Sequence, residues 1–218
     1  MHNQSKPNTE KKKKVSIFSP EHPFSDYMIK LGWTIIFNCL WMICCLPIIT
    51  IGAATVSLYT VMLELTAEKP FHLFSLFFCS FKKNFVYATT YWLILAVAGV
   101  ICWIDLTYFY YMGSNIGYIC LAVAGLITLL YLCLLVTIFP VIAKFQTSWT
   151  GVLQTSFYII RRHLKAILVC IIITALVMFL MRNIVLFYYM IIFGYGLVAF
   201  ILSYIFNKIF DQYTKEKQ

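Results

Sequence analysis

The chain contains 218 residues, of which 62% are hydrophobic and only 11% carry a charge. Soluble globular proteins are about 45–50% apolar and about 25% charged, so this composition excludes an ordinary soluble domain. The apolar residues form long runs, and the short alternating segments typical of a transmembrane barrel do not occur. The sequence therefore predicts an all-α protein, a polytopic membrane helical bundle.

The net charge of +9 and the eight cysteines both have plain explanations in such a protein. Lysine and arginine mark the cytoplasmic side of membrane proteins, so the charge does not predict nucleic-acid binding. All the cysteines but Cys79 lie inside apolar runs, where a thiol behaves as a small hydrophobe, and no two have CxxC spacing. We therefore expect no disulfide, no bound metal and no cofactor.

The N-terminal segment, which begins MHNQSKPNTEKKKK, lacks the apolar side chains that a packed core needs. We expect residues 1–26 to be a disordered basic tail and residues 27–210 to form the helical membrane domain. Residues 211–218 are expected to be a polar C-terminal tail. About 20 apolar residues cross the roughly 30 Å hydrocarbon core of a bilayer, and several runs within 27–210 reach that length.

The run from Leu31 to Leu65 is too long for one short span and is interrupted by Pro47. Proline lacks a backbone donor and its ring clashes with the preceding turn, so a helix kinks or breaks there. We interpret the run as a hairpin of two short spans, 31–46 and 48–65. The alternative is a single kinked and tilted span.

The segment after this run predicts an amphipathic helix. Phenylalanines recur at steps of three and four, which places them on one helix face: Phe71, Phe74, Phe78, Phe81 and Phe85. Lys82 and Lys83 lie off that face. Such a helix either lies in the membrane surface with its basic end at the headgroups, or buries its aromatic face against the bundle.

Four further spans are expected at 91–111, 116–139, 166–181 and 184–206. Pro140 is expected to end the second of these spans. The segment 141–165 carries another apolar stripe, which begins at Trp149 and is closed by Arg161 and Arg162. The two segments thus form a weak internal repeat of amphipathic helix, basic cluster and span.

The distribution of charge indicates the number of spans. In the hairpin interpretation, 16 of the 17 lysines and arginines fall on one side of the membrane, with only Arg182 opposite. A five-span arrangement would divide them, whereas lysine and arginine concentrate in cytoplasmic loops. The sequence therefore predicts about six transmembrane helices, two cytoplasmic amphipathic helices, and N and C termini that are both cytoplasmic.

Three stretches carry a resemblance to a known family. LWMICCLPIITIGAATVSLYTVMLEL, the following FFCSFKKNFVYATTYW and the later PVIAKFQTSW resemble the YesL family of small integral membrane proteins. The similarity extends over about residues 25–210, and 46–54 is its most distinctive part. The resemblance implies a multi-span protein of the bacterial cell membrane that is linked to carbohydrate uptake and degradation, and it supplies no catalytic residues.

Two charged residues form the first candidate site. Asp105 is the one acidic residue well inside a predicted span, and Arg182 is the only basic residue expected near the same outer level. A charge inside the bilayer costs at least about 2.5–3.5 kcal/mol, which makes Asp105 a functional candidate. Either the two side chains pair across the bundle, or each reaches water independently.

The turn at Pro47 is the second candidate site. Small and hydroxyl-bearing residues follow it, namely Thr50, Gly52, Thr55 and Ser57. They favour a tight seam between helices, because small residues let helices approach closely. The alternative is a broken-helix solute site of the kind that transporters use.

The sequence contains no nucleophile elbow, Walker, HExxH or dinucleotide-binding motif, so an enzyme is not expected. We expect an accessory or assembly component of carbohydrate uptake, whose partner is membrane lipid, a carbohydrate transporter complex or a second copy of the chain. The candidate docking residues are Phe71, Phe74, Phe78, Phe81, Lys82, Lys83, Phe85, Trp149, Arg161 and Arg162. The alternative is a small-solute transporter in its own right.

Overall fold

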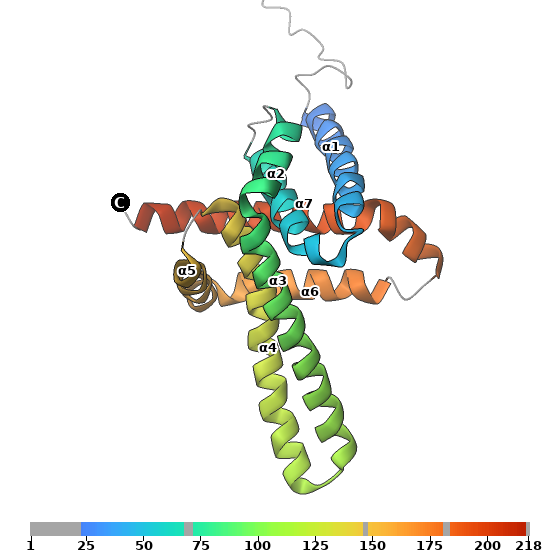
Figure 1. The fold of residues 1–218 in the computed structure, drawn as a ribbon, viewed down its shortest axis with the longest axis vertical. Coiled ribbons are helices and arrows are strands. Elements are labelled where there is room, and N and C mark those ends of the chain that lie inside the picture. Colours follow the sequence, from blue (N-terminus) through green and yellow to red (C-terminus); the bar gives the residue numbers. More distant parts are fainter. Residues whose placement is uncertain (1–22, 68–71, 146–147, 181–183, 217–218) are drawn as a thin grey trace, which may run out of the picture.

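The structure is a computed structural model that describes residues 23–67, 72–145, 148–180 and 184–216. Its elements are α1 (Pro23–Cys44), the 3-10 turn η1 (Ile48–Thr50), α2 (Ile51–Thr66), α3 (Leu73–Met112), α4 (Asn115–Lys144), α5 (Trp149–Arg162), α6 (Leu164–Leu180) and α7 (Ile184–Glu216), as Figure 1 shows. The described residues contain no strand, which confirms the all-α fold class. Residues 1–22 of the expected tail, Phe71 and Arg182 lie outside the described residues.

Helix α2 is the centre around which the other helices pack. In its membrane-span segment 67% of the residues are buried, against 11–22% for α1, α3 and α4. Helix α2 contacts α1, α3, α4 and α7. Its first two turns are rich in small residues, and Gly52, Ala53, Ala54 and Ser57 are all buried. Small side chains let neighbouring helices approach, so the composition of α2 suits its central position.

Helices α1 and α2 fold back on one another at Pro47. The Trp41 indole donates to the Thr55 hydroxyl over 3.2 Å, and the Thr34 hydroxyl lies 3.8 Å from the Met62 sulfur. The two residues of each pair are equally far from residue 48, seven positions in the first pair and fourteen in the second. These are the contacts of an antiparallel hairpin, not of a single kinked span.

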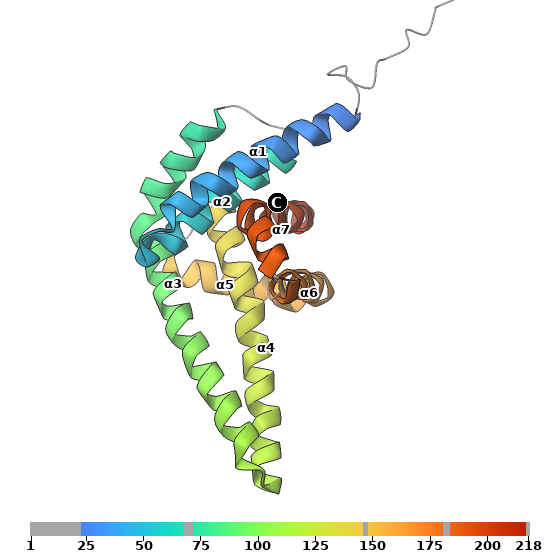
Figure 2. The ribbon, with the colours of Figure 1, turned by 90° about the vertical axis from the view of Figure 1, so that its right-hand side faces the viewer.

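Helix α3 corrects the prediction of a separate surface helix. It runs without a break over 40 residues, and so joins the aromatic segment to the expected span at 91–111. At 1.5 Å per residue this length is about 60 Å, roughly twice the hydrocarbon core. No glycine or proline lies between Lys83 and Tyr91, so nothing in that stretch favours a helix end. Figure 2 shows that α3 instead bends where it passes the α1–α2 turn.

Two other helix ends also differ from the expected ones. Pro140 lies inside α4, which continues to Lys144, so this proline does not end the helix. Helix α7 continues through Glu216, and most of the expected polar tail 211–218 is therefore helical. By contrast, α5 and α6 are separate helices bent by 99° at His163. In the first copy of the sequence repeat, the amphipathic segment and the following span thus form one helix, α3. In the second copy they form two helices, α5 and α6.

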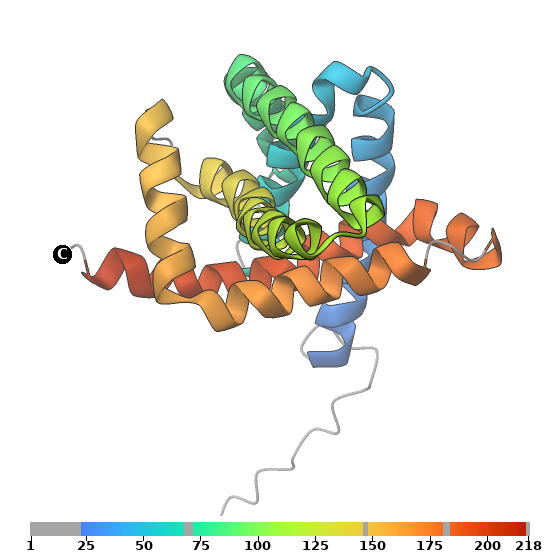
Figure 3. The same cartoon turned by 90° about the horizontal axis from the view of Figure 1, so that it is seen from below.

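Besides the α1–α2 hairpin, the helices form two further hairpins, α3–α4 and α6–α7, that cross. The α3–α4 hairpin projects far from the centre, whereas α6 and α7 lie side by side and run across it (Figures 1 and 3). The outer surface of α3–α4 is apolar, with Trp103, Ile104, Ile119 and Leu126 all exposed. Among the described residues, four helices are long and apolar enough to span a membrane, or five if the bent α5–α6 pair counts as one span. These features are those of a multi-pass membrane protein, and the number of six spans stays a prediction.

Candidate functional site

The turn between α1 and α2 is held by hydrogen bonds on two sides. The Thr50 hydroxyl donates to the carbonyl oxygen of Pro47 over 2.6 Å and also to that of Cys44. From α3, the Trp92 indole donates to the carbonyl oxygen of Ile48 over 3.0 Å. These side-chain bonds add to the backbone bonds of the turn, in which the Thr50 amide donates to the Pro47 carbonyl oxygen and the Ile51 amide to that of Ile48. The turn is therefore a fixed feature that ties the hairpin to α3.

Gly52 and Ser57 serve the packing of α2. A Cβ atom on Gly52 would lie 2.3 Å from the carbonyl oxygen of Ala88, so only glycine allows α2 and α3 this close. The Ser57 hydroxyl donates to the carbonyl oxygen of Ala53 within its own helix, over 2.8 Å. For these two residues the structure agrees with the tight-seam interpretation of the sequence.

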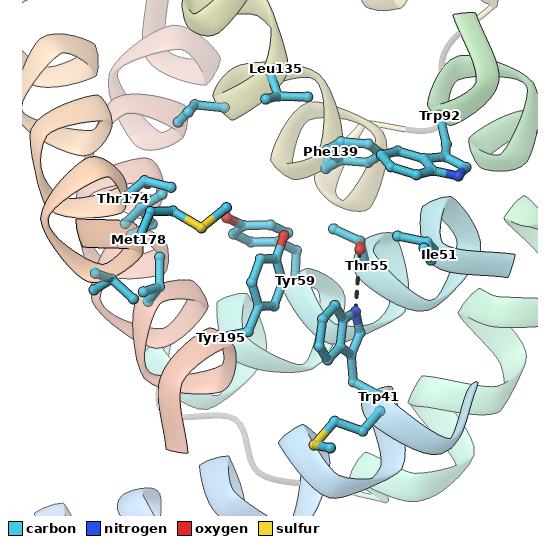
Figure 4. Close-up of a pocket in the computed structure, with 15 residues that line it drawn as sticks. Trp41, Ile51, Thr55, Tyr59, Trp92, Leu135, Phe139, Thr174, Met178 and Tyr195 are labelled. Atoms are coloured by element: carbon cyan, nitrogen blue, oxygen red, sulfur yellow. Dashed lines mark hydrogen bonds between the residues drawn. The ribbon is translucent and has the colours of Figure 1, made fainter. Parts of the chain in front are cut away.

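Thr55 lies instead at a cavity next to the turn. The cavity has a volume of about 460 Å³ and is lined by side chains of α1, α2, α3, α4, α6 and α7. Figure 4 shows Trp41, Trp92, Leu135, Thr174 and Tyr195 around it. Ligand pockets in proteins typically enclose about 300–1,000 Å³, so this cavity is large enough for a small molecule.

Aromatic and hydroxyl groups line one side of the cavity. The rings of Trp41 and Tyr195 stack with their centroids 4.3 Å apart and their planes 10° from parallel. The Trp41 indole is oriented by its bond to the Thr55 hydroxyl, drawn as a dashed line in Figure 4. Tyr59, which is only 4% exposed, directs its hydroxyl into the cavity (Figure 4). In the described part of the chain that hydroxyl has no hydrogen-bond partner.

The chemistry of the cavity is that of binding an uncharged molecule. None of the described side chains that line it is acidic or basic, and its polar groups are the hydroxyls of threonine and tyrosine together with indole nitrogens. Such a lining offers hydrogen bonds and aromatic faces to a bound molecule. It offers no group that would exchange a proton near neutral pH.

Sequence reasoning found one residue of this cavity and missed the rest. Thr55 belongs to the predicted turn site, whereas Trp41, Tyr59, Trp92 and Tyr195 come from four different helices. In the sequence these aromatic residues stand within apolar runs like many others. Only the folding of α7 against α1 and α2 brings them together, so no local signal could identify them.

Asp105 lies on the outer half of α3 and is exposed. It is seven residues before the end of the helix at Met112, or about 10 Å along the axis. Its expected partner Arg182 lies outside the described residues, so the pairing of the two stays a prediction. The structure does not bring Asp105 to the cavity or to the turn.

The phenylalanine stripe on α3 is divided between the interior and the surface. Phe81 is half-buried and stacks on Phe77, which is fully buried against Phe37 of α1. The three exposed members are Phe74 (45%), Phe78 (46%) and Phe85 (36%), and Lys82 and Lys83 are exposed as well. Part of the stripe is therefore buried against the bundle, and contact of its exposed part with the membrane surface stays a prediction.

Helix α5 has two distinct faces. Val152, Ser156 and Ile159 are fully buried, whereas Trp149 (44%), Leu153 (39%) and Phe157 (48%) are exposed. Trp149 also stacks on Tyr91 of α3 and packs against the tilted ring of Tyr87, and its carbonyl oxygen accepts a hydrogen bond from the Tyr91 hydroxyl over 2.7 Å. Arg161 and Arg162 are exposed in the last turn. Trp149 thus joins α5 to α3 just beyond the predicted docking residues of α3, which end at Phe85.

Comparisons with known proteins extend this description over part of the chain. No curated protein and no solved structure matches the sequence. A family model does match residues 34–106, which run from the middle of α1 to the outer part of α3. The matched segment includes the Pro47 turn, Gly52, Thr55 and Asp105. Over these residues the chain is similar to the family described as "Protein of unknown function, DUF624".

Proposed function

We propose that the protein is an accessory component of a membrane transport assembly and that it docks onto a partner protein through α5. The observation that supports this is the division of α5 into two faces. Its inner face anchors the helix, while Trp149, Leu153 and Phe157 remain exposed beside Arg161 and Arg162. Aromatic residues and arginine are enriched at protein–protein interfaces. A helix that presents apolar residues at this spacing fits a groove on a partner.

The finer parts of the proposal rest on the sequence. The resemblance to the YesL family favours an assembly for carbohydrate uptake in the bacterial cell membrane, and it favours a role without enzymatic activity. The distribution of lysine and arginine favours six spans with both termini in the cytoplasm. On that topology, α5 faces the cytoplasm, where the soluble subunits of an uptake system are accessible.

Site-specific photo-crosslinking in cells tests the docking role. A photoreactive amino acid is placed at Leu153 or Phe157 on α5, and at Ile172 on α6 as a control that is also apolar and exposed. We expect the two α5 positions, but not Ile172, to crosslink to the same transporter subunit, identified by mass spectrometry. Crosslinks from α5 to lipid alone would contradict docking onto a protein.

A small-solute transporter is the second candidate, and the cavity is the observation that favours it. The cavity lies next to a broken helix, as solute sites in transporters do. Its uncharged lining favours a neutral solute. Reconstitution into liposomes separates the two functions, because a transporter moves its solute without a partner protein. A Val177→Phe change, which narrows the cavity, should then reduce flux and leave the α5 crosslinks unchanged.

A further inference from the structure

The cavity between α1, α2, α3, α4, α6 and α7 combines an apolar wall with the hydroxyl of Tyr59, which makes no hydrogen bond to the described residues. We propose that this cavity binds an uncharged amphiphile, a hydrocarbon chain that ends in a hydroxyl or ester group. The proposal does not depend on docking through α5, since a partner protein and a cavity ligand occupy different parts of the molecule.

The lining determines the main part of the ligand. Leu135, Phe139, Val177, Val198 and Leu202 are among the side chains that form the wall. Because no charged side chain is present in the described lining, an ionised group inside the cavity would lose its hydration without compensation. A sugar would leave most of its hydroxyls without partners for the same reason. A hydrocarbon chain, by contrast, is stabilised by every apolar contact it makes.

The Tyr59 hydroxyl determines the polar end of the ligand. A hydroxyl that a ligand closes off from water needs a hydrogen bond from that ligand, because leaving it without one costs about 1–3 kcal/mol. Tyr59 is 4% exposed, and Figure 4 shows its hydroxyl directed into the cavity on the side of Met178. The Tyr195 hydroxyl also points into the cavity (Figure 4) and interacts with Thr55. A ligand oxygen placed between α2 and α6 would supply the hydrogen-bond partner that the described residues do not give Tyr59.

The α6 side of the cavity provides the entrance. Met178 lines the cavity and is 65% exposed, so the cavity reaches the outer surface of the molecule at this residue. Methionine is flexible and adapts to different apolar shapes, which suits the mouth of such a site. The exposed neighbours Ile172 and Leu176 make the surrounding surface apolar. A hydrocarbon chain therefore reaches the cavity from the bilayer without crossing water.

Tryptophan fluorescence of the purified protein in detergent tests the proposal. Two of the five tryptophans, Trp41 and Trp92, line the cavity. Changing Trp33, Trp103 and Trp149 to Phe leaves only these two as reporters. The probe is 11-bromo-1-undecanol, whose bromine quenches tryptophan on contact. We expect quenching that saturates and that the unbrominated alcohol reverses. Quenching that rises linearly with the probe indicates partition into the micelle alone and would overturn the proposal.

Variants at the wall locate the binding. Val136→Phe and Val177→Phe fill the cavity from α4 and α6 and should each remove the saturable quenching. Val123→Phe is the matched control, because Val123 lies on the exposed surface of α4 away from the cavity. Two filling variants on different helices keep the test informative if one of them does not fold. Saturable quenching that survives in a folded filling variant would place the ligand elsewhere.

The Tyr59→Phe variant tests the polar end. It removes the hydroxyl and keeps the ring, so we expect binding of the bromo-alcohol to weaken about two- to tenfold. Binding of 1-bromoundecane, which lacks the hydroxyl, should stay the same. Equal effects on the two probes, or no effect on either, would contradict a hydrogen bond to Tyr59.

A further quenching experiment shows whether the occupant of the cavity is a membrane lipid or a free amphiphile. The protein is placed in vesicles of phosphatidylcholine with brominated acyl chains, and the quenching is compared between the parent and Val177→Phe. Stronger quenching in the parent identifies a lipid chain as the occupant. Equal quenching, together with saturable binding of the bromo-alcohol in detergent, identifies a free amphiphile. Equal quenching without saturable binding would overturn the proposal.

Discussion

Two glycines set the distances between helices at the centre of the molecule. Gly52 of α2 lies against the backbone of Ala88 in α3, and Gly196 of α7 lies against Asn38 and the Thr34 carbonyl oxygen in α1. A Cβ atom on Gly196 would be 2.8 Å from the Cβ of Asn38. The Asn38 side-chain oxygen accepts a hydrogen bond from the Gly196 amide over 2.8 Å. The close approach of α7 to α1 thus allows a hydrogen bond between the two helices, as is common in membrane proteins.

Replacing Gly52 by alanine should lower the thermal stability in detergent. The added methyl group would meet the Ala88 carbonyl, and overpacking of this kind costs about 1–3 kcal/mol. Gly125→Ala is the control, since nothing lies within 4 Å of its Cβ position. That variant should be neutral or more stable by up to about 1 kcal/mol, because alanine favours helix. Equal behaviour of the two variants would show that α2 and α3 are not in close contact.

Replacing Ser156 by alanine should instead raise the stability or leave it unchanged. In the described part of the chain its hydroxyl is buried without a hydrogen-bond partner, and removing such a group relieves about 1–3 kcal/mol. The matched control is Ser203→Ala, because the equally buried Ser203 hydroxyl donates to the Ala199 carbonyl oxygen over 2.7 Å. The difference between the two unfolding temperatures is the measurement. A larger loss in Ser156→Ala than in Ser203→Ala would contradict the structure.

At the scale of elements, the sequence predicted most helices and misplaced several of their ends. The break at Pro47 was predictable because proline lacks a backbone donor and clashes with the preceding turn, and α1 ends at Cys44, three residues before it. Pro140 has the same chemistry but four helical residues after it, and tertiary packing buries Pro140, Val141 and Ile142. Local propensity is a weak guide where burial decides. The continuity of α3 is explained likewise by the burial of Phe77, Ala88 and Tyr91 along it.

Asn207 of α7, which lies just beyond the predicted span 184–206, bonds to the C-terminal end of α2. The Asn207 amide donates to the carbonyl oxygen of Leu63 over 2.9 Å and to the Thr66 hydroxyl over 2.7 Å. These bonds join α7 to the C-terminal end of α2, where the Leu63 carbonyl oxygen also accepts a hydrogen bond from the Ala67 amide. They also explain why α7 continues as a helix beyond the predicted span end at 206.

Replacing Asn207 by leucine should therefore destabilise the protein by about 1–2 kcal/mol, since two hydrogen bonds are lost. The control is Asn84→Leu, in which the lost bond, to the Ser80 hydroxyl, lies within a single helix. Its effect should be smaller, about 0.5 kcal/mol. Thermal unfolding of both variants in the same detergent provides the comparison, and an equal loss would mean that Asn207 does not join α2 to α7.

At the scale of the whole molecule, the crossing of the two hairpins could not be predicted. Each apolar run is long enough for a span, and hydropathy says nothing about the angle between spans. Since α6 and α7 run across α3 and α4, the two hairpins cannot both stand along the membrane normal in this arrangement (Figures 1 and 2). The basic ends of α6–α7, near Lys165 and Lys215, nevertheless lie toward the same end of that hairpin (Figure 1).

Labelling of single cysteines in intact cells decides which side each hairpin end faces. In a background without the native cysteines, we expect Tyr111→Cys, at the exposed tip of α3, to react with a membrane-impermeant maleimide. Lys82→Cys and Arg161→Cys should react only after the cells are opened. From Lys82 to Tyr111 the helix extends about 43 Å, which suffices to cross the roughly 30 Å core even when α3 bends.

Lys215→Cys at the end of α7 is the decisive position. Reaction only in opened cells would place the basic end of α6–α7 on the same side as Lys82 and Arg161, and would support a hairpin that enters and leaves on the cytoplasmic side. Reaction in intact cells would contradict cytoplasmic C termini. A result that placed Lys82→Cys and Arg161→Cys on opposite sides of the membrane would have a wider consequence. Because the rings of Trp149 of α5 and Tyr87 of α3 are in contact, with centroids 4.3 Å apart, a membrane could not separate these segments in the structure. That outcome would therefore remove both the predicted topology and the docking surface that depends on it.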